Sequence, residues 1–326
     1  MKKIKVKSHP NIALVKYWGK RSEEKNLPSV GSISITLDEL STITEVYINK
    51  ISNDEFIINN KKANEREQQK ISKFLDYFRA RSSKKYYLKI KTTNNFPTAA
   101  GLASSASGYA ALTYAANHIF DLNLSAKELT QYARLGSGSA ARSIFGGYVE
   151  LHKGELESGE DCFAEQILAP DQFPLKVIVA ITDETPKKTS SRDGMKLSQQ
   201  TSPFFQSFVE TSEQDISFMK QAIKSRDFYM MSEIAQQSCI KMHSVMMTTK
   251  EPLFYWNSKT FSIIEFVLKF QKEKYPIFFT IDAGPQVKIV TLPGEEKNII
   301  EKLTKLNVIQ QHFVIGLGNG TEIIEE

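Results

Sequence analysis

The sequence predicts an α+β protein with strands and helices in two halves. Apolar and polar residues alternate along 3–8, as in a half-buried strand, whereas the apolar residues of 64–82 recur at helical spacing. Near the C-terminus the expected order is helix–strand–strand–helix–strand, which favours a ferredoxin-like arrangement. A length of 326 residues is enough for about two domains. We place them at 1–185 and 186–326, with the boundary in the polar stretch 184–198.

The first half is expected to mix strands with helices. The apolar face of helix 64–82 consists of Ile71, Phe74, Leu75 and Phe78. Ser125 and Glu128 have the spacing of a capping box at the start of a further helix. The other elements expected here are strands at 11–17, 32–37, 41–48, 85–95 and 174–183, helices at 101–119 and 125–135, and a short helix within 136–147.

The second half begins with a long helical region rich in methionine, 200–246. The elements expected after it are a helix at 258–273, strands at 276–282 and 287–292, a helix at 295–306 and a strand at 311–316. These elements give the ferredoxin-like order described above.

The composition excludes several classes of protein. The formal net charge is +5, and no basic block of the kind that binds nucleic acid occurs. The lysines of "MKKIKVK" fit the exposed face of an edge strand. No run of 18 apolar residues predicts a membrane span. Cys162 and Cys239 lie far apart and outside any CxxC pattern, which favours a reducing, cytoplasmic location over a disulfide framework or a zinc site.

The stretch "PTAAGLASSAS", 97–107, packs small residues into a turn before an Ala-rich helix. A helix N-terminus carries unpaired N–H groups and a partial positive charge, so a phosphate binds there readily. Ser104 and Ser105 add two hydroxyls. The stretch is neither a Walker A loop nor a GxGxxG motif, and a purely structural turn is the commoner explanation of such a pattern.

The stretch "NIALVKYWGKR", 11–21, places Lys16, Tyr17 and Lys20 after an apolar strand. Taken alone it is typical of an amphipathic strand with solvated lysines. Asp282 ends a very apolar strand before "AGP". A carboxylate in that position is a turn residue, or it is paired or catalytic, because burying it alone is costly.

The loop 97–107 resembles the ATP loop of the GHMP kinases. Together with "NIALVKYWGKR", four further blocks occur in the order typical of one branch, the mevalonate diphosphate decarboxylases: 26–39, 136–147, 190–195 and 281–289. The resemblance covers nearly the whole chain. It implies the GHMP kinase fold, whose N-terminal half is similar to domain 2 of ribosomal protein S5, with ATP and Mg²⁺ as cofactors and a homodimer as the assembly.

The resemblance also implies a reaction. ATP phosphorylates the C3 hydroxyl of mevalonate 5-diphosphate, and loss of phosphate and CO₂ gives isopentenyl diphosphate. Asp282 would orient or deprotonate the hydroxyl, and Lys16 would keep that carboxylate ionised. Any Mg²⁺ would be carried by ATP phosphates, with Ser105 as a possible ligand. The catalytic residues implied are Asp282, Lys16, Arg142, Asn11 and Ser105.

The same resemblance implies two sets of binding residues. The diphosphate substrate would be bound by Tyr17, Trp18, Gly19, Lys20, Arg66, Ser137, Gly138, Ser139, Ala140, Ala141, Arg142, Ser191 and Arg192. ATP would be bound by Pro97, Ala100, Gly101, Leu102, Ala103, Ser104 and Ser105. Arg66 fits a solvated helix face equally well. His243, next to Met242, fits a structural histidine better than a ligand.

One departure leaves alternatives open. Val30-Gly31 stands where the family more often has Asn-Ser or Asn-Asn, so a monophosphate substrate is an alternative. A mevalonate 3-kinase would lack the Asp282–Lys16 pair, and a non-catalytic nucleotide sensor would have lost the base or the phosphate loop.

Overall fold

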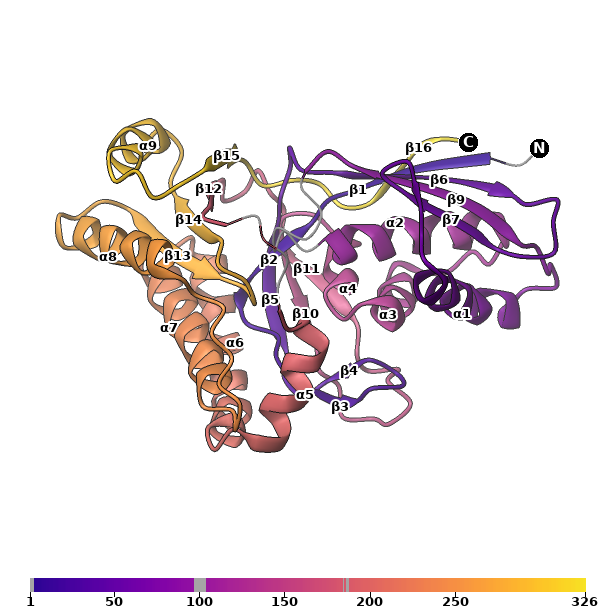
Figure 1. Cartoon of the computed structure of the whole chain (residues 1–326), viewed down its shortest axis with the longest axis horizontal. Helices are drawn as coiled ribbons and strands as arrows, with labels where there is room; N and C mark the ends of the chain where they lie inside the picture. The colour runs from indigo at the N-terminus through magenta and orange to yellow at the C-terminus, as the bar shows by residue number, and fades with distance from the viewer. Residues whose placement is uncertain (1–2, 97–103, 184, 186–187) are drawn as a thin grey trace.

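The computed structural model describes residues 3–96, 104–183, 185 and 188–326. Figure 1 shows the N-terminal half, in indigo and magenta, beside the C-terminal half, in orange and yellow. A six-stranded sheet forms the outer layer of the N-terminal half. Its order is β16 (Glu322–Glu325), β1 (Lys3–Ser8), β6 (Thr42–Ile48), β9 (Leu88–Asn94), β7 (Glu55–Ile58) and β8 (Lys61–Lys62). Because β16 pairs with β1, the two ends of the described chain lie together (Figure 1).

Four helices belong to this half: α1 (Glu65–Arg81), α2 (Ser104–Ile119), α3 (Ala126–Gly136) and α4 (Ala140–Ser143). Helix α2 packs against β1 and β6. The four apolar residues expected on one face of α1 are all buried, which confirms that prediction. The capping box at Ser125 and Glu128 is also confirmed. The predicted start of α2 at 101–103 lies outside the described residues.

A second sheet occupies the middle of the molecule, in the order β11 (Ala164–Leu168), β10 (Tyr148–Leu151), β5 (Ser32–Thr36) and β2 (Asn11–Val15). Strand β2 ends two residues earlier than expected. Its pairing with β5 shifts register between Ala13 and Val15, and such a bulge re-aims the chain beyond it. The hairpin of β3 (Lys20–Ser22) and β4 (Leu27–Pro28), which the sequence pattern did not predict, follows.

The third sheet has the order β13 (Ile277–Ile281), β14 (Val287–Thr291), β12 (Lys176–Ile181) and β15 (Gln311–Ile315), all antiparallel. This is the ferredoxin-like order, with β12 as its first strand. Strand β12 therefore shares a sheet with β13, β14 and β15, although it lies within residues 1–185. An apolar run does not show which sheet it joins. We propose that the domain boundary lies between β11 and β12.

Helices α5 (Ser191–Thr201), α6 (Phe205–Ser225), α7 (Phe228–Met247) and α8 (Ser258–Lys272) lie between β12 and β13. Helix α5 fills most of the polar stretch that we expected to be a boundary, and Ser190 caps it. Helix α9 (Glu296–Thr304) completes the half. Among the described residues, no helix combines the length and apolar character needed to cross a bilayer.

One hydrophobic core joins the two halves. Ile12 and Ile33 of the second sheet pack in the same cluster as Val177 and Phe278 of the third sheet and Met219 of α6. The Thr280 hydroxyl also donates a 3.0 Å hydrogen bond to the carbonyl of Ala13. Strand β2 is thus fixed between the N-terminal and C-terminal halves, and the segment that follows it lines the cavity described below.

Candidate active site

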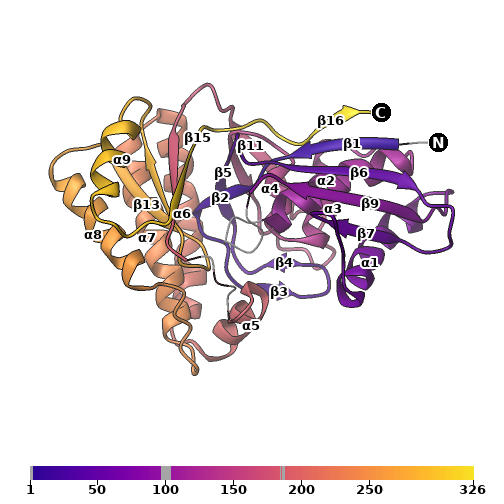
Figure 2. The ribbon, with the colours of Figure 1, turned by 45° about the horizontal axis from the view of Figure 1, so that its top comes forward.

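A cavity of about 360 Å³ lies where the segment after β2, the start of α2, the 136–139 turn, α5 and the end of β13 meet. Figure 2 shows α5 and the β3–β4 hairpin close together on one side of the molecule. The backbone N–H of Lys20 in β3 donates a 3.3 Å hydrogen bond to the side-chain oxygen of Gln199 in α5. The predicted site residues that line the cavity are Asn11, Lys16, Tyr17, Trp18, Lys20, Ser104, Ser105, Ser137, Gly138, Ser139, Arg142, Ser191, Arg192 and Asp282.

Four predicted binding residues are not among those that line this cavity: Gly19, Arg66, Ala140 and Ala141. Gly19 instead lies against Phe205, where a Cβ would be 2.5 Å from the ring. Ala140 and Ala141 are buried in α4. Arg66 is exposed on α1. The predicted nucleotide residues Pro97, Ala100, Gly101, Leu102 and Ala103 lie outside the described residues.

The cavity is also lined by residues that sequence reasoning missed, including Asn26, Lys70, Met195 and Met242. Lys70 stands four residues after Arg66, so helical spacing would have placed it on the same face of α1. Lys288, which lies behind the cavity wall, was missed as well. Its signal was a lysine inside the apolar strand "VKIVT", because a buried charge needs a partner.

Asp282 lies between two buried lysines. Its Oδ1 is 2.8 Å from Lys16 Nζ, and its Oδ2 is 3.3 Å from Lys288 Nζ. Burial alone would raise the pKa of Asp282. The attraction of Lys16, followed by that of Lys288, outweighs burial and holds the pKa well below its usual range. Asp282 is therefore an ionised carboxylate whose side chain is 29% exposed, on the cavity side.

Arg142 is a buried cation on the cavity wall, 2% exposed. Its guanidinium donates to the hydroxyls of Ser32 and Ser34 and to the Asn11 side-chain oxygen. In the described part of the chain, no carboxylate lies within 4.0 Å of it. Burial lowers the pKa of Arg142 to about 10. A buried guanidinium bonded only to neutral groups is suited to receive an anion.

Asn11 contacts Arg142 and the turn before α4. Its amide donates to the carbonyl of Ser139 at 3.0 Å and to the hydroxyl of Ser143 at 2.8 Å. These bonds fix the side-chain oxygen that accepts from Arg142. Among the hydrogen bonds of the described residues, none joins Asn11 to Lys16.

Tyr17 and Trp18 line the cavity, and each carries a polar atom without a partner in the described part of the chain. The Tyr17 hydroxyl and the Trp18 indole N–H are buried and lack hydrogen-bond partners among the described residues. Burial raises the pKa of Tyr17 far above its usual range, so its hydroxyl remains a donor. A Cβ at Gly138 would lie 2.5 Å from this hydroxyl, which explains why glycine is required there.

Lys20 is positioned by Asn26, a residue in the left-handed region with φ of 53°. The Lys20 ammonium donates to the Asn26 side-chain oxygen. The Asn26 amide donates in turn to the carbonyls of Arg134 and Leu135, at 2.9 and 3.1 Å. Burial, and then the nearby Arg192, lower the pKa of Lys20 to about 8. The bonds of Asn26 thus fix a lysine that loses its charge unusually easily.

Lys70 and Arg192 extend the positive charge toward α1 and α5. The Lys70 ammonium lies 5.4 Å from the centre of the Tyr109 ring. Burial, Arg192 and Arg66 lower the pKa of Lys70, in that order of importance. The cations that line the cavity are Lys16, Lys20, Lys70, Arg142 and Arg192. Among the described lining residues Asp282 is the one carboxylate, so the cavity attracts anions.

A row of serine hydroxyls crosses the cavity from the start of α2. The hydroxyl oxygens of Ser105 and Ser137 are 3.5 Å apart, and those of Ser137 and Ser139 are 3.2 Å apart. Hydroxyls both donate to phosphate oxygens and bind Mg²⁺. His243 is different, because it is buried behind the wall and accepts from Trp256 at 3.2 Å. Burial lowers the pKa of His243 to about 3, which fits the structural histidine we expected.

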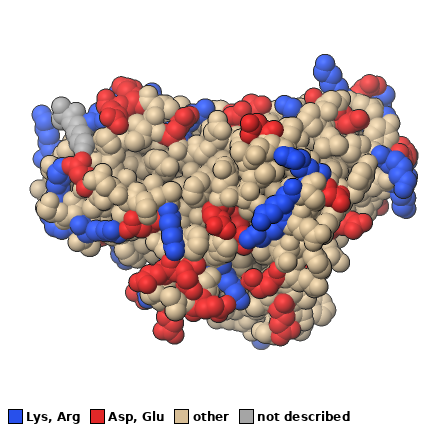
Figure 3. Space-filling model, turned by 180° about the vertical axis from the view of Figure 1, so that it is seen from behind, with Lys and Arg blue, Asp and Glu red and all other residues tan. Residues whose placement is uncertain are grey.

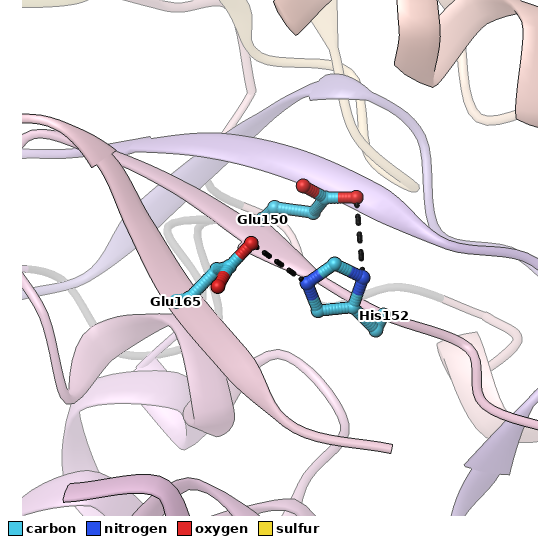
Figure 4. A group of neighbouring side chains, drawn as sticks. All are labelled: Glu150, His152 and Glu165. Atoms are coloured by element: carbon cyan, nitrogen blue, oxygen red, sulfur yellow. Dashed lines mark hydrogen bonds and ion pairs between the residues drawn. The ribbon is translucent and has the colours of Figure 1, made fainter. Parts of the chain in front are cut away.

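A second ionisable cluster lies outside the cavity (Figure 4). His152 has one ring nitrogen 3.4 Å from Glu150 and the other 3.0 Å from Glu165. Lys220 of α6 is 2.5 Å from the other oxygen of Glu150. Since each of these groups already has a partner, the cluster ties α6 to the second sheet. Figure 3 shows both signs of charge interspersed over one face of the molecule.

The fold and the cavity together define an enzyme of the GHMP kinase type. Two family models match the chain: "Diphosphomevalonate decarboxylase-like N-terminal domain" over residues 8–164, and "Mevalonate 5-diphosphate decarboxylase C-terminal domain" over 177–316. The chain belongs to the diphosphomevalonate decarboxylase family. The second match starts inside β12, which agrees with the place of that strand in the C-terminal sheet.

Individual proteins of this family are similar over most of the chain. The diphosphomevalonate decarboxylase of Saccharomyces cerevisiae is 35% identical, over 91% of this chain and 79% of the relative. The crystal structure of mevalonate diphosphate decarboxylase from Staphylococcus aureus has a TM-score of 0.94 and 38% identity, with 99% of this chain and 98% of that chain covered. MDDEF in complex with MVAPP, AMPPCP and magnesium has a TM-score of 0.92 and 37% identity, with 99% of both chains covered.

Proposed function

We propose that this chain catalyses the ATP-dependent decarboxylation of mevalonate 5-diphosphate to isopentenyl diphosphate in the mevalonate pathway, with release of ADP, phosphate and CO₂. The observation that carries the proposal is Asp282, an ionised carboxylate and the one carboxylate among the described residues that line a cavity with five cations. The diphosphate, the carboxylate and the nucleotide all carry negative charge, and this cavity is suited to receive such groups.

Asp282 orients the C3 hydroxyl of the substrate and accepts its proton. Its low pKa makes it a weak base, so positioning of the hydroxyl contributes more than full proton transfer in a loose phosphoryl-transfer transition state. After phosphorylation the C3–O bond breaks and its electron pair leaves with the phosphate. The C1–C2 bond then supplies the electrons of the new double bond, and C1 leaves as CO₂. Lys16 faces the cavity and stabilises negative charge on the phosphoryl group.

The remaining cations bind the charged ends of the substrate. Lys20, Lys70 and Arg192 bind the diphosphate together with the Tyr17 hydroxyl, which has no partner among residues 3–96 and 104–183 or in the described part after them. Arg142 binds the substrate carboxylate, because its planar guanidinium suits a bidentate partner. Release of CO₂ removes this contact, so the carboxylate is bound only until it leaves.

The described residues fit a magnesium nucleotide. Ser104 and Ser105 lie at the start of α2 and line the cavity, where a helix N-terminus favours phosphate. Asp282 is already compensated by two lysines, so Ser105 and the phosphate oxygens are the suitable ligands for Mg²⁺. When bound, the metal neutralises charge on the transferring phosphate. We further propose a homodimer that acts in the cytoplasm, which sedimentation and cell fractionation would test.

The proposal is tested by ADP release with Mg-ATP on mevalonate 5-diphosphate and, in parallel, on mevalonate 5-phosphate. We expect ADP, CO₂ and isopentenyl diphosphate from the diphosphate alone. Preference for the monophosphate would mean that Val30-Gly31 accompanies a changed substrate. ADP without CO₂ would indicate a 3-kinase. Nucleotide binding without ADP from either substrate would contradict the enzyme and indicate a sensor.

The low pKa of Lys20 predicts an alkaline limit to substrate capture. The profile of kcat/KM reports groups of the free enzyme, and Lys20 loses its charge as the pH rises through about 8. We expect kcat/KM for the diphosphate to fall above that pH. In Lys20→Arg the fall should disappear from this range, because a guanidinium stays charged. An unchanged fall in Lys20→Arg would show that another group titrates.

A further inference from the structure

Lys288 is the second lysine at Asp282, and the turn between β13 and β14 places it there. Asp282 directly follows β13, and Lys288 lies opposite Thr280 in the paired strand β14. The side chain of Lys288 is 2% exposed, and its ammonium is 3.3 Å from Asp282 Oδ2. A lysine buried to this degree is costly unless a carboxylate pairs with it.

The two lysines approach Asp282 from different sides. Lys16 and Asp282 both line the cavity, whereas Lys288 is not among the described residues that line it. Each lysine contacts its own carboxylate oxygen, Oδ1 for Lys16 and Oδ2 for Lys288. Lys16 can therefore reach a bound substrate while Lys288 stays behind the carboxylate.

We propose that Lys288 is a positioning residue, which holds Asp282 ionised and correctly oriented from behind while Lys16 turns toward the phosphoryl group. This inference rests on the proposed function. A phosphoryl group in the cavity attracts the Lys16 ammonium and weakens its contact with Asp282. With Lys288 in place, the carboxylate keeps a buried cation throughout. Without Lys288, only Lys16 would hold the Asp282 carboxylate ionised and oriented.

Two ionisable groups of α7 and one arginine that sense Asp282 do not titrate in the working range. Cys239 and His243 of α7 face the same three charges. Burial raises the pKa of Cys239 to about 11 and lowers that of His243 to about 3, so both are neutral between these limits. Arg142 is the further cation that senses Asp282, and its pKa of about 10 keeps it charged. In the protein without substrate, a change on the acid side therefore reports Asp282.

The test compares Lys288→Met with the wild-type enzyme. An opposite charge at this distance lowers the pKa of a carboxyl group by about 1–3 units, so the acid limb of kcat should move upward by about that amount. Misorientation of Asp282 should also lower kcat on the order of tenfold to a hundredfold. KM for mevalonate 5-diphosphate should change little, because Lys288 does not reach the cavity. Lys288→Arg, which keeps the charge, should restore the acid limb.

Two controls separate positioning from simple destabilisation. Thr291→Val removes a different buried polar contact of β14, a 2.6 Å hydrogen bond to the carbonyl of Pro276, and should leave the acid limb in place. The carboxyl carbon signal of Asp282, assigned by its loss in Asp282→Asn, should titrate at higher pH in Lys288→Met and in Lys288→Gln without substrate. If Lys288→Met does not fold, Lys288→Gln decides the question.

The outcomes are distinct. An unmoved acid limb and an unmoved carboxyl titration in a folded variant would overturn the role of Lys288, with the decarboxylase intact. Absence of turnover in the wild-type chain would instead contradict the proposed function. A raised carboxyl titration together with a reduced kcat and a steady KM would support the positioning role.

Discussion

Asp282→Asn is expected to lower kcat by about 10²–10⁴-fold, the usual contribution of a positioned acid or base. Asparagine keeps the shape of the side chain but cannot accept the proton of the C3 hydroxyl, and it no longer compensates Lys16 and Lys288. KM for mevalonate 5-diphosphate should change much less, since the cations that bind the diphosphate remain. Steady-state release of ADP and CO₂ measures both quantities.

Asp215→Asn is the matched control. Asp215 is a mostly buried aspartate on α6 whose two oxygens each lie 2.8 Å from Lys241, outside the catalytic cavity. Its replacement also breaks an Asp–Lys pair, but kcat should stay near the wild-type value. A similar loss of kcat in both variants would mean that the effect of Asp282→Asn is structural.

Asp282→Asn should also change the stability of the folded protein. The pKa of Asp282 is lowered in the folded protein, so its contribution to stability is present above its unfolded pKa, about 3.9, and is lost as the pH falls through the folded value. Removing one partner of a buried pair costs up to about 3–5 kcal/mol. Asp282→Asn should therefore unfold at lower temperature at neutral pH, with a smaller difference in strong acid.

Arg142→Gln should have the second largest effect and a different signature. We expect kcat/KM for the diphosphate to fall by about 10²–10³-fold, as when one preorganised donor is removed from a site. The free energy of unfolding should not fall, because the variant removes a buried cation that has no carboxylate partner within 4.0 Å among the described residues. Glutamine can still bond to Ser32 or Ser34.

Arg134→Gln provides the comparison. Arg134 is buried to a similar degree, but it donates to the backbone carbonyls of Lys25 and Gly159 and so ties two loops together. This variant should lower the melting temperature more than Arg142→Gln does, and should lower kcat/KM less. A melting temperature that drops strongly in Arg142→Gln would show that Arg142 serves the fold as well as the site.

The sequence predicted the structure best where contacts between residues close together in the chain determine it. The capping box at Ser125 and the apolar face of α1 depend on neighbours within a few residues, and both are confirmed. The ordered blocks also indicated most of the cavity wall. The sheet that β12 joins could not be predicted from its apolar run, because distant segments decide which strands pair. Lys70 and Lys288 were missed although the sequence held a signal for each: Lys70 stands at helical spacing from Arg66, and Lys288 is a charged residue inside an apolar strand.

The pairing of β16 with β1 has a consequence for synthesis. The N-terminal sheet takes the strand beside β1 from a segment that follows the entire C-terminal half. During translation, one edge of β1 therefore stays unpaired until the ferredoxin-like half has left the ribosome. An unpaired edge is a template for association with another chain. Newly made chains should thus need protection from a holdase chaperone for longer than the size of the first half alone would suggest.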